Sequence, residues 1–420
     1  MMTLLIKNIK SLVGVFDGLG KKKFLSGTEM SSLNSIDNAF LLIANNQISD
    51  FGEMSVELIS RLTSHITDLQ TIDANGKLVL PSYCDSHTHL VFASSREQEF
   101  VDRIKGLSYQ EIAQRGGGIL NSVKKLREAS EEELYLSAWE RLNEIMMQGT
   151  GAVEIKSGYG LNLESELKML RVIKRLSENH PLTIKATFLG AHAVPSEYKD
   201  KKEKYMGLLI NEMLPSIAHE RLADYCDVFC EQGYFTKEET IRLLIAAKKY
   251  NITPKIHAEQ LSHSGGIEAG VETGAISVDH LEYCNDHDIE LLKNSEVMPT
   301  ILPGAQFFLQ LQNPPARKMI DAGLPVAIAS DYNPGSSPSG NMNTMIALAC
   351  IQYKMTPEES FNAGTINTAY AMGISETHGS IAKGKTANVF ITREIPSLSY
   401  MPYSFGSNLI ETVIINGKVV

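Results

Sequence analysis

Four side chains in this sequence are of the types that bind a transition metal, and each follows a short apolar run. His87 and His89 form a His-x-His pair, and His257 and Asp331 follow later runs. Alternate residues of an extended chain face the same side, so both imidazoles of the pair can reach one ion. Three imidazoles and one carboxylate suit Zn²⁺ or iron. An isolated His-x-His pair is more often two hydrogen-bonded histidines, so the prediction of a metal site depends on all four residues together.

His280 ends another apolar run and offers a further imidazole. It could be a fifth ligand, a catalytic group or a histidine buried in the core. Four protein ligands and a water complete a mononuclear site, so we assign His280 to catalysis. Other polar residues also follow apolar runs: Lys156, Tyr159, His192, Glu231, Gln260 and Asn333.

The apolar runs before these residues predict eight short strands, separated mostly by helical stretches. The strands are expected at residues 78–80, 152–155, 183–189, 226–230, 253–256, 276–278, 297–302 and 325–329. The clearest helices are expected at 131–147 and 164–178, where apolar residues recur at spacings of three and four. This alternation predicts an α/β fold, a (β/α)8 TIM-type barrel whose C-terminal mouth would collect the polar residues. An open doubly wound sheet is the alternative, and the lack of Gly-x-Gly-x-x-Gly after the first strand disfavours it.

Both ends of the chain are instead rich in short apolar runs broken by turns. Asn45-Asn46 predicts a hairpin near the N-terminus, and Asn416-Gly417 predicts another near the C-terminus. We therefore predict two domains: a composite small β-sandwich domain of residues 1–76 and 378–420, and a metal-dependent catalytic barrel of residues 77–377.

Composition excludes several partners. The 420 residues carry a formal net charge of −10, from 39 basic and 49 acidic residues, with no long basic run. This balance disfavours a nucleic-acid partner, and an anionic substrate would need a local Arg or Lys. No apolar run reaches about 18 residues, so no membrane partner is expected. Five cysteines without a framework spacing, and an N-terminus without a signal-peptide pattern, indicate free thiols and a cytoplasmic location.

Six motifs resemble the imidazolonepropionase family of the amidohydrolase superfamily, and the match covers nearly the whole chain. They lie at residues 85–92, 114–119, 154–161, 189–193, 257–260 and 330–337. The His-x-His pair is shared by the whole superfamily. The Lys-Ser-Gly-Tyr-Gly and Asp-x-Asn-Pro-Gly-Ser runs are specific to this family.

The resemblance implies an activity, a cofactor and an oligomeric state. The reaction would be hydrolysis of the lactam ring of 4-imidazolone-5-propanoate to N-formimidoyl-L-glutamate, in histidine degradation. The protein would be a homodimer with one Zn²⁺ or Fe ion per subunit. By motif position, the metal ligands would be His87, His89, His257 and Asp331. The substrate contacts would be Arg96, Tyr159, His192, Gln260, Asn333, Gly335 and Ser336.

Roles follow from the chemistry of these side chains. Asp331 can take a proton from the attacking water and pass it to the leaving ring nitrogen. His280 can hold that water or stabilise the oxyanion. Arg96 offers a planar fork for the propanoate carboxylate, although without the resemblance it would be interpreted as a solvated surface arginine. Tyr159 is either a hydrogen-bond donor or part of the core.

Two features leave alternatives open. The loop at Gly116–Gly118 could cover the mouth or could simply join two helices. Glu231 could bridge to a second metal, but we favour hydrogen bonding at the rim and a mononuclear site.

Gln260 bears on the competing functions. Related deaminases have a proton-shuttling glutamate at this position, and an amide cannot transfer a proton, which counts against a nucleobase deaminase. The runner-up functions are another cyclic amidohydrolase or deaminase, and a non-catalytic metal-bearing binding protein.

Overall fold

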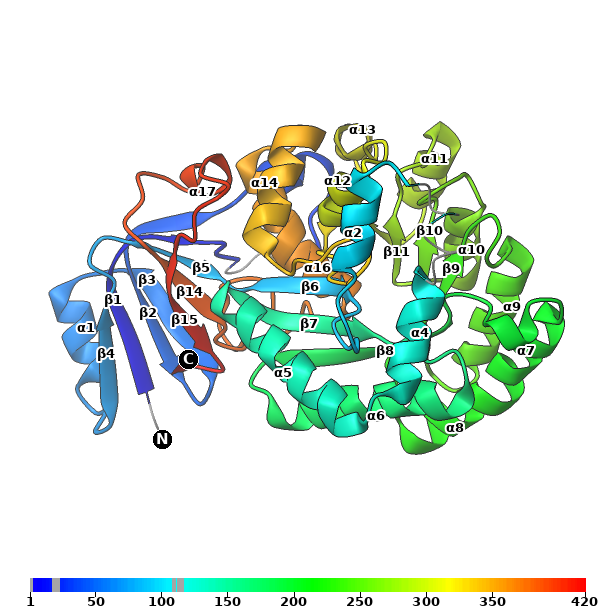
Figure 1. The fold of residues 1–420 in the computed structure, drawn as a ribbon. Coiled ribbons are helices and arrows are strands. Elements are labelled where there is room, and N and C mark those ends of the chain that lie inside the picture. Colours follow the sequence, from blue (N-terminus) through cyan, green and yellow to red (C-terminus); the bar gives the residue numbers. More distant parts are fainter. Residues whose placement is uncertain (1–2, 17–22, 108–110, 112–116) are drawn as a thin grey trace.

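A parallel barrel and a second sheet built from both chain ends make up the protein (Figure 1). The computed structural model describes residues 3–16, 23–107, 111 and 117–420. Within these residues, no helix combines the length and apolar character that crossing a membrane requires.

The barrel strands pair in sequence order, each parallel to the next. They are β6 (Tyr83–Thr88), β7 (Thr150–Lys156), β8 (Thr183–Ala191), β9 (Tyr225–Cys230), β10 (Thr253–Ala258), β11 (Ser277–His280), β12 (Met298–Ile301) and β13 (Ala327–Ile328). A parallel bridge between Thr88 and Tyr332 joins the two ends of this sheet. The predicted TIM-type barrel is therefore confirmed, and its closure brings β6 beside the segment that carries Asp331.

The described helices around the barrel separate its strands and cover its outer face (Figure 1). They are α2 (Glu97–Ile104), α4 (Ile119–Glu128), α5 (Glu131–Met147), α6 (Leu163–Asn179), α7 (Lys202–Leu208), α8 (Leu214–Glu220), α9 (Lys237–Lys248), α10 (Gly266–Thr273), α11 (Asp286–Lys293), α12 (Pro303–Leu309), α13 (Ala316–Asp321), α14 (Met342–Tyr353), α15 (Pro357–Asn362) and α16 (Thr368–Ala371). Side-chain caps define where several begin. Ser130 and Glu133 form a capping box on α5, and the Asn162 side chain accepts from Ser165 N at the start of α6.

The terminal sheet combines strands from both ends of the chain, in the order β16-β15-β14-β5-β1-β2-β3, with β4 also paired to β1. Its strands are β1 (Thr3–Val13), β2 (Ser35–Ala44), β3 (Gln47–Glu53), β4 (Leu69–Asp73), β5 (Leu78–Pro81), β14 (Val389–Thr392), β15 (Ile410–Ile415) and β16 (Lys418–Val419). The predicted hairpins at Asn45-Asn46 and Asn416-Gly417 join β2 to β3 and β15 to β16. Two helices lie between strands of this sheet in the sequence: α1 (Val56–Thr63) between β3 and β4, and α17 (Tyr400–Tyr403) between β14 and β15.

One predicted barrel strand was wrong. Residues 78–80 belong to β5, which pairs with β1 and β14 in the terminal sheet. The first barrel strand is β6, whose sequence Tyr-Cys-Asp-Ser-His-Thr is too polar to look like a buried strand. Its polar side chains are buried because they have partners: Asp85, for example, accepts hydrogen bonds from the backbone N–H and hydroxyl of Ser330. The domain boundary at residues 76 and 77 stays a prediction.

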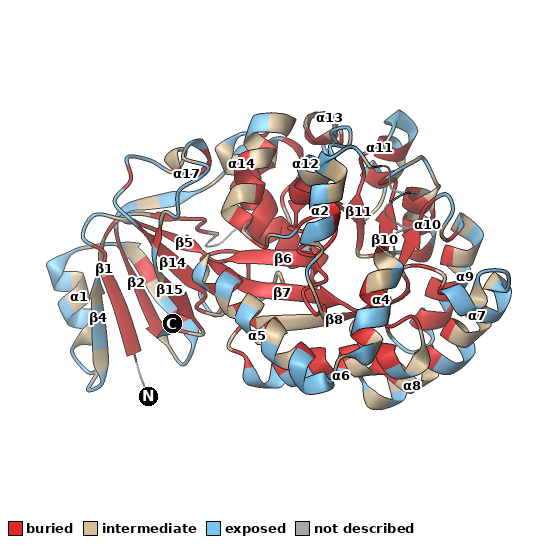
Figure 2. Ribbon diagram, in the orientation of Figure 1, coloured by how far each residue is buried: buried red, intermediate tan, exposed pale blue. Residues whose placement is uncertain are grey.

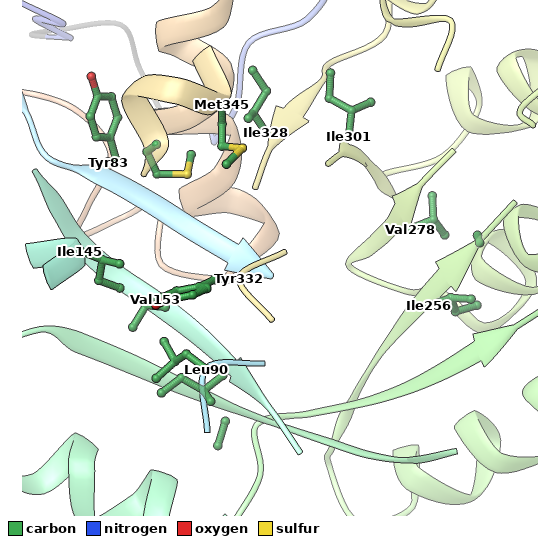
Figure 3. Close-up of a cluster of buried hydrophobic side chains, with 14 of the residues drawn as sticks. Tyr83, Leu90, Ile145, Val153, Ile256, Val278, Ile301, Ile328, Tyr332 and Met345 are labelled. Carbon is green, nitrogen blue, oxygen red and sulfur yellow. The ribbon is translucent and has the colours of Figure 1, made fainter. Parts of the chain in front are cut away.

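Successive side chains of the barrel strands point alternately toward the surrounding helices and toward the inside of the barrel. Val153, Ile256 and Val278 belong to the apolar cluster between strands and helices (Figure 3). Their chain neighbours Glu154, His257 and Asp279 are buried on the opposite face of the strands. Most residues of the barrel strands are buried, while exposed residues gather on the outer helices (Figure 2). The polar interior of the barrel is therefore enclosed by an apolar layer.

The interior of the terminal sheet is apolar. Side chains from strands at both ends of the chain form one buried cluster, hereafter the sheet cluster. Its buried members are Leu4, Ile6, Ile9, Leu12, Val15, Ala39, Leu41, Ile43, Ile48, Phe51, Ala74, Val79, Ile381, Ala387, Val389, Ile391 and Ile414. The cluster therefore brings together strands from the first and last parts of the chain.

Candidate metal and substrate site

The predicted metal ligands converge at the C-terminal mouth of the barrel. His87 is within β6, His257 is in β10, and Asp331 follows β13. The Nε2 atoms of His87 and His89 each lie 3.5 Å from Oδ1 of Asp331. The rings of His87 and His257 are 4.4 Å apart between centroids. The ligand atoms fall into two close trios that share His87: one with His89 and Asp331, the other with His257 and His280.

The local hydrogen bonding fits a metal ion among these side chains. Nε2 of both His87 and His257 is buried and has no hydrogen-bond partner among the described residues. Buried polar atoms in folded proteins are nearly always satisfied, so these two unpartnered nitrogens need an explanation. An ion bound by these nitrogens and by Asp331 supplies one, because neutral imidazole and carboxylate are its natural ligands.

Electrostatics favour the protonation states that a metal requires. Burial lowers the pKa of His87 and His89 well below the ordinary value and also lowers that of His257. These imidazoles are therefore neutral at pH 7, with a lone pair available for coordination. Burial raises the pKa of Asp331 to about 6, against the hydrogen bonds from Asn333 and Ser336.

The backbone is held in uncommon conformations where the site residues leave their strands. Asp331 has φ of 54°, and His280 and Leu281 have φ of 90° and 73°. Residues other than glycine seldom adopt such values, and they persist at sites where the surrounding structure enforces them. Asp331 N donates to His87 O at 2.9 Å, so barrel closure itself fixes this ligand.

His280 lies beside the ligand group. Its ring centroid is 5.2 Å from that of His257 and 5.4 Å from that of His87. Burial lowers its pKa to about 4, so it is a neutral group that can accept a proton. His87, His257 and His280 also meet as a possible ligand trio, so the geometry allows both roles considered for His280.

A cavity of about 910 Å³ opens beside the metal ligands. All seven predicted substrate contacts line it: Arg96, Tyr159, His192, Gln260, Asn333, Gly335 and Ser336. Arg96 is not a solvated surface residue, because its side chain is only 15% exposed and forms an ion pair with Glu99. The other carboxylate oxygen of Glu99 accepts from Gly118 N at 2.9 Å. The arginine is thus held at the cavity wall.

The loop after Asp331 is shaped by its own hydrogen bonds. Asn333 Oδ1 accepts from the backbone N–H groups of Gly335 and Ser336, at 2.7 and 2.8 Å, and its Nδ2 donates to Asp331 O at 2.7 Å. A side chain at position 335 would collide with the guanidinium of Arg96. Asn333 therefore organises the loop around Arg96, and the Asp-x-Asn-Pro-Gly-Ser motif has a steric reason for its glycine.

Tyr159 and His192 form the opposite wall. The carbonyl of Gly158 accepts a hydrogen bond from Nδ1 of His192 at 3.1 Å, which leaves Nε2 free to face the cavity. Gly158 has φ of +105°, and a Cβ there would meet Nδ1 of His192 at 2.9 Å. His192 stacks on His89, with ring centroids 5.1 Å apart. The Lys-Ser-Gly-Tyr-Gly run thus positions a histidine from the next strand.

Two acidic residues near the mouth have their oxygens directed elsewhere. Glu231 accepts from the backbone N–H groups of Gln232 and Leu261, at 2.9 and 2.8 Å. Glu259 accepts from Gly265 and Ile267 at the start of α10, so it faces the helix rather than the cavity.

The predicted loop at Gly116–Gly118 is only partly visible. Gly116 lies outside the described residues, and Gly118 immediately precedes α4.

Sequence reasoning missed several residues at this site. Arg103 lines the same cavity, donates to Gly335 O at 2.8 Å and stacks over Phe308. Glu282 is buried near His280, with 3.9 Å between Oε1 and Nδ1, and neither of its oxygens has a hydrogen-bond partner in the described chain. A group of charged residues also lies beneath the metal ligands. The sequence signal that could have revealed this charged group is a charged residue inside an otherwise apolar strand, such as Asp227 in β9.

Comparisons with known proteins agree with this geometry. The amidohydrolase family model matches residues 78–420. Imidazolonepropionases from Christiangramia forsetii and Flavobacterium psychrophilum are each 59% identical over 419 residues, covering all of both chains. The imidazolonepropionase of Geobacillus kaustophilus is 45% identical over 93% of this chain and 92% of its own.

Solved structures show the same fold at much lower identity. Guanine deaminase of E. coli superposes with a TM-score of 0.75 and 13% identity, covering 100% of this chain and 99% of the other. A triazine hydrolase variant gives 0.75 with 15% identity, covering 99% and 94%. At these identities the likeness concerns the fold alone.

Proposed function

The chain belongs to the imidazolonepropionase family of the amidohydrolases, and we propose that it hydrolyses the lactam ring of 4-imidazolone-5-propanoate to N-formimidoyl-L-glutamate, in histidine degradation. One observation carries the proposal: all seven family-matched substrate residues line one cavity together with His89, His257 and Asp331, and His87 lies directly behind them, 3.5 Å from Asp331. A lactam with an anionic arm needs a metal ion to activate water and an arginine to bind the arm, and this site offers residues for both.

Arg96 binds the propanoate carboxylate in this proposal. Its guanidinium is at the cavity wall, fixed from one side by Glu99 and limited on another by Gly335. A planar fork of N–H donors matches a carboxylate, and Arg96 can keep one edge for Glu99 while presenting the other. Binding the arm orients the ring toward His87, His89, His257 and Asp331.

Proton transfer falls to Asp331 and His280. An ion held by the four ligands would lower the pKa of a water and so supply hydroxide at neutral pH. Asp331 lies beside the imidazoles of His87 and His89, where it can take a proton and return it to the ring nitrogen that leaves. His280, neutral and on the cavity wall, can hold the attacking water or stabilise the oxyanion.

We propose one Zn²⁺ or Fe ion per subunit, without a second metal at Glu231. The backbone and hydroxyl hydrogen bonds that Glu231 accepts support this, because they occupy the oxygens a bridging ligand would use.

Ring opening is favoured over deamination by the residues around Gln260. This amide lines the cavity at the position of the deaminase glutamate, and it cannot shuttle a proton. The neighbouring Glu259 points to the start of α10 and cannot replace it. A leaving ring nitrogen stays tethered to the product, so Asp331 can protonate it in place.

The family also suggests a homodimer in the cytoplasm. All five cysteines are free thiols in the structure, which fits a reducing compartment. Light scattering of the purified protein at several concentrations would measure the oligomeric state directly.

The proposed function is tested by removing and restoring the metal. We expect elemental analysis to give about one zinc or iron per chain, chelation to abolish turnover of imidazolonepropanoate, and either ion to restore it. Full turnover by verified metal-free protein would contradict the proposal.

A further inference from the structure

Five charged side chains are fully buried beneath the metal ligands, inside the barrel. They are Glu154 and Lys156 on β7, Asp227 on β9, Lys255 on β10 and Asp279 on β11, here called the charged layer. Each has a relative exposure of 0%. Buried charges on this scale cost much free energy unless they are paired, so their contacts need a full description.

Lys156 is at the centre of the layer. Its Nζ lies 2.7 Å from Oε1 of Glu154, 2.8 Å from Oδ2 of Asp227 and 3.7 Å from Oδ2 of Asp279. Lys255 instead contacts Glu154 and donates to Ser86 O at 3.1 Å. Of the two lysines, Lys156 is the one that joins the carboxylates of two different strands.

Those two carboxylates contact the candidate metal ligands with the same oxygen atoms. Oδ2 of Asp279 is 2.6 Å from Nδ1 of His87, and Oδ2 of Asp227 is 3.0 Å from Nδ1 of His257. The first contact is a short hydrogen bond, and the second is close but not well aligned. One ammonium group therefore lies against both oxygens that touch the inner nitrogens of two ligating histidines.

The consequence concerns which imidazole nitrogen faces the ion. A carboxylate beside Nδ1 keeps the proton on that nitrogen, so that Nε2 carries the lone pair and points away from the carboxylate. Nε2 of His87 and Nε2 of His257 are buried without a hydrogen-bond partner in the described chain, and Nδ1 of His257 also lacks one because its contact with Asp227 is poorly aligned. Fixing the two carboxylates therefore fixes both the tautomer and the direction of two ligands.

We propose that Lys156 is a positioning residue for the metal site, holding Asp227 and Asp279 so that His87 and His257 present Nε2 to one ion. This inference rests on the ligand set of the proposed function. The removal of Lys156 leaves two buried carboxylates without the ammonium group that they share, and Asp227 loses a hydrogen bond of 2.8 Å to its Oδ2. The other oxygens keep their partners, since Oδ1 of Asp227 accepts from His257 N and Oδ1 of Asp279 accepts from Ser277 Oγ, so the expected change is in the two Oδ2 atoms that face the histidines. The defect would reach histidines on two strands, β6 and β10, at once.

The contrary view is that Lys156 only stabilises the barrel. A half-buried lysine elsewhere in the chain, Lys385, allows the two views to be separated. Its Nζ donates to Ser375 O, His378 O and Ser380 Oγ, at 2.7, 2.8 and 2.8 Å, so its recorded partners include no carboxylate and no metal ligand. Lys385→Met removes a half-buried ammonium that contacts none of the candidate metal ligands.

The test measures zinc affinity rather than activity. Wild type, Lys156→Met, Lys156→Gln and Lys385→Met are stripped of metal, checked by circular dichroism, and titrated with Zn²⁺ in competition with a chromophoric chelator. We expect both Lys156 variants to bind zinc about 10–100-fold more weakly than wild type, the usual effect of losing an outer partner of a ligand. Lys385→Met should bind within about twofold of wild type even if its melting temperature falls.

The visible spectrum of the cobalt-substituted protein gives a second measurement, which does not depend on the stability of the fold. The visible spectrum of Co²⁺ reports ligand geometry, so the Lys156→Gln protein should differ from wild type whereas Lys385→Met should not. Wild-type zinc affinity and an unchanged cobalt spectrum in folded Lys156 variants would overturn the inference. Absence of zinc binding by wild type would instead overturn the proposed metal site, so the two failures are distinguishable.

Discussion

The charged layer beneath the barrel mouth and the sheet cluster are both fully enclosed, yet their chemistry is opposite. The charged layer consists of three carboxylates and two ammonium groups. The sheet cluster consists of aliphatic side chains and one phenylalanine. Burying aliphatic area stabilises a fold by about 25 cal/mol per Å². Burying ion pairs is often neutral or unfavourable against apolar replacements.

The difference separates residues that hold the fold from residues that hold the site. The sheet cluster joins the chain ends and contributes stability without facing the cavity. The charged layer, by our account, contributes orientation: its carboxylates touch His87 and His257 from below. Substitutions in the two regions should therefore have different signatures, and the following predictions are arranged from the largest effect to the smallest.

Removal of a metal ligand should give the largest loss of activity. His257→Ala takes away one of four ligands, and metal catalysis supplies several kcal/mol of transition-state stabilisation, so kcat/KM should fall by at least about a thousandfold. Steady-state kinetics with metal in excess measure this. His378→Ala is the matched control, because His378 is a buried histidine that contacts Thr183 outside the cavity. Comparable activity in both variants would remove His257 from the site.

The sheet cluster should respond in stability instead. Leu41 is fully buried there, and Leu41→Ala should lower the free energy of unfolding by about 2–5 kcal/mol, the range for large-to-small core substitutions. Urea denaturation would measure it. The kcat/KM of the folded variant should match wild type, and a large drop in kcat/KM would show that the two regions are coupled.

Arg96 should have an intermediate effect on substrate binding. Arg96→Lys keeps the charge but loses the bidentate fork, so transition-state stabilisation should fall by about 1–3 kcal/mol, and Arg96→Ala should be worse. The control is Arg175→Lys, because Arg175 also pairs with a glutamate but on an exposed helix face. If both Arg96 variants keep wild-type kcat/KM, the arginine does not bind the substrate.

Lys156 and Lys385 should differ in the pH dependence of stability. Burial lowers the pKa of Lys385 from 10.5 to about 8, whereas the carboxylates around Lys156 outweigh burial and raise its pKa. Below pH 8 Lys385 is charged in both folded and unfolded states, and the full cost of burial is present. Between about pH 8 and 10.5 the folded protein releases this proton first, and the cost is relieved.

Wild type should therefore gain stability over Lys385→Met by on the order of 1–2 kcal/mol across that window, after discounting for partial exposure. Urea midpoints at pH 8 and pH 10 would measure the difference. Wild type should show no such gain relative to Lys156→Met. If it gained stability over Lys156→Met between pH 8 and 10, the pKa shift of Lys156 would have the wrong direction.

Much of the fold was predictable because strand and helix periodicities are local. The strand at 78–80 was misplaced because apolar character alone identifies a buried strand poorly here: β6 is polar, and its buried polar side chains find partners only in the closed barrel. The four candidate metal ligands could be selected from the sequence because they are rare residue types after apolar runs, and the barrel brings them close together. The contacts of Lys156 could not be predicted, because its partner Asp227 is 71 residues away in the chain and only the closed barrel brings the two together.

The central claim is the reaction itself, and one measurement tests it directly. Purified metal-loaded enzyme is incubated with imidazolonepropanoate, and in parallel with guanine, cytosine and adenosine, while formimidoyl-glutamate and ammonia are both quantified. We predict stoichiometric formimidoyl-glutamate without ammonia from the first substrate, because Gln260 cannot shuttle the proton that ammonia release requires. We predict no useful turnover of the bases, which lack an anionic arm for Arg96. Stoichiometric ammonia from one of those bases, with imidazolonepropanoate untouched, would contradict the account.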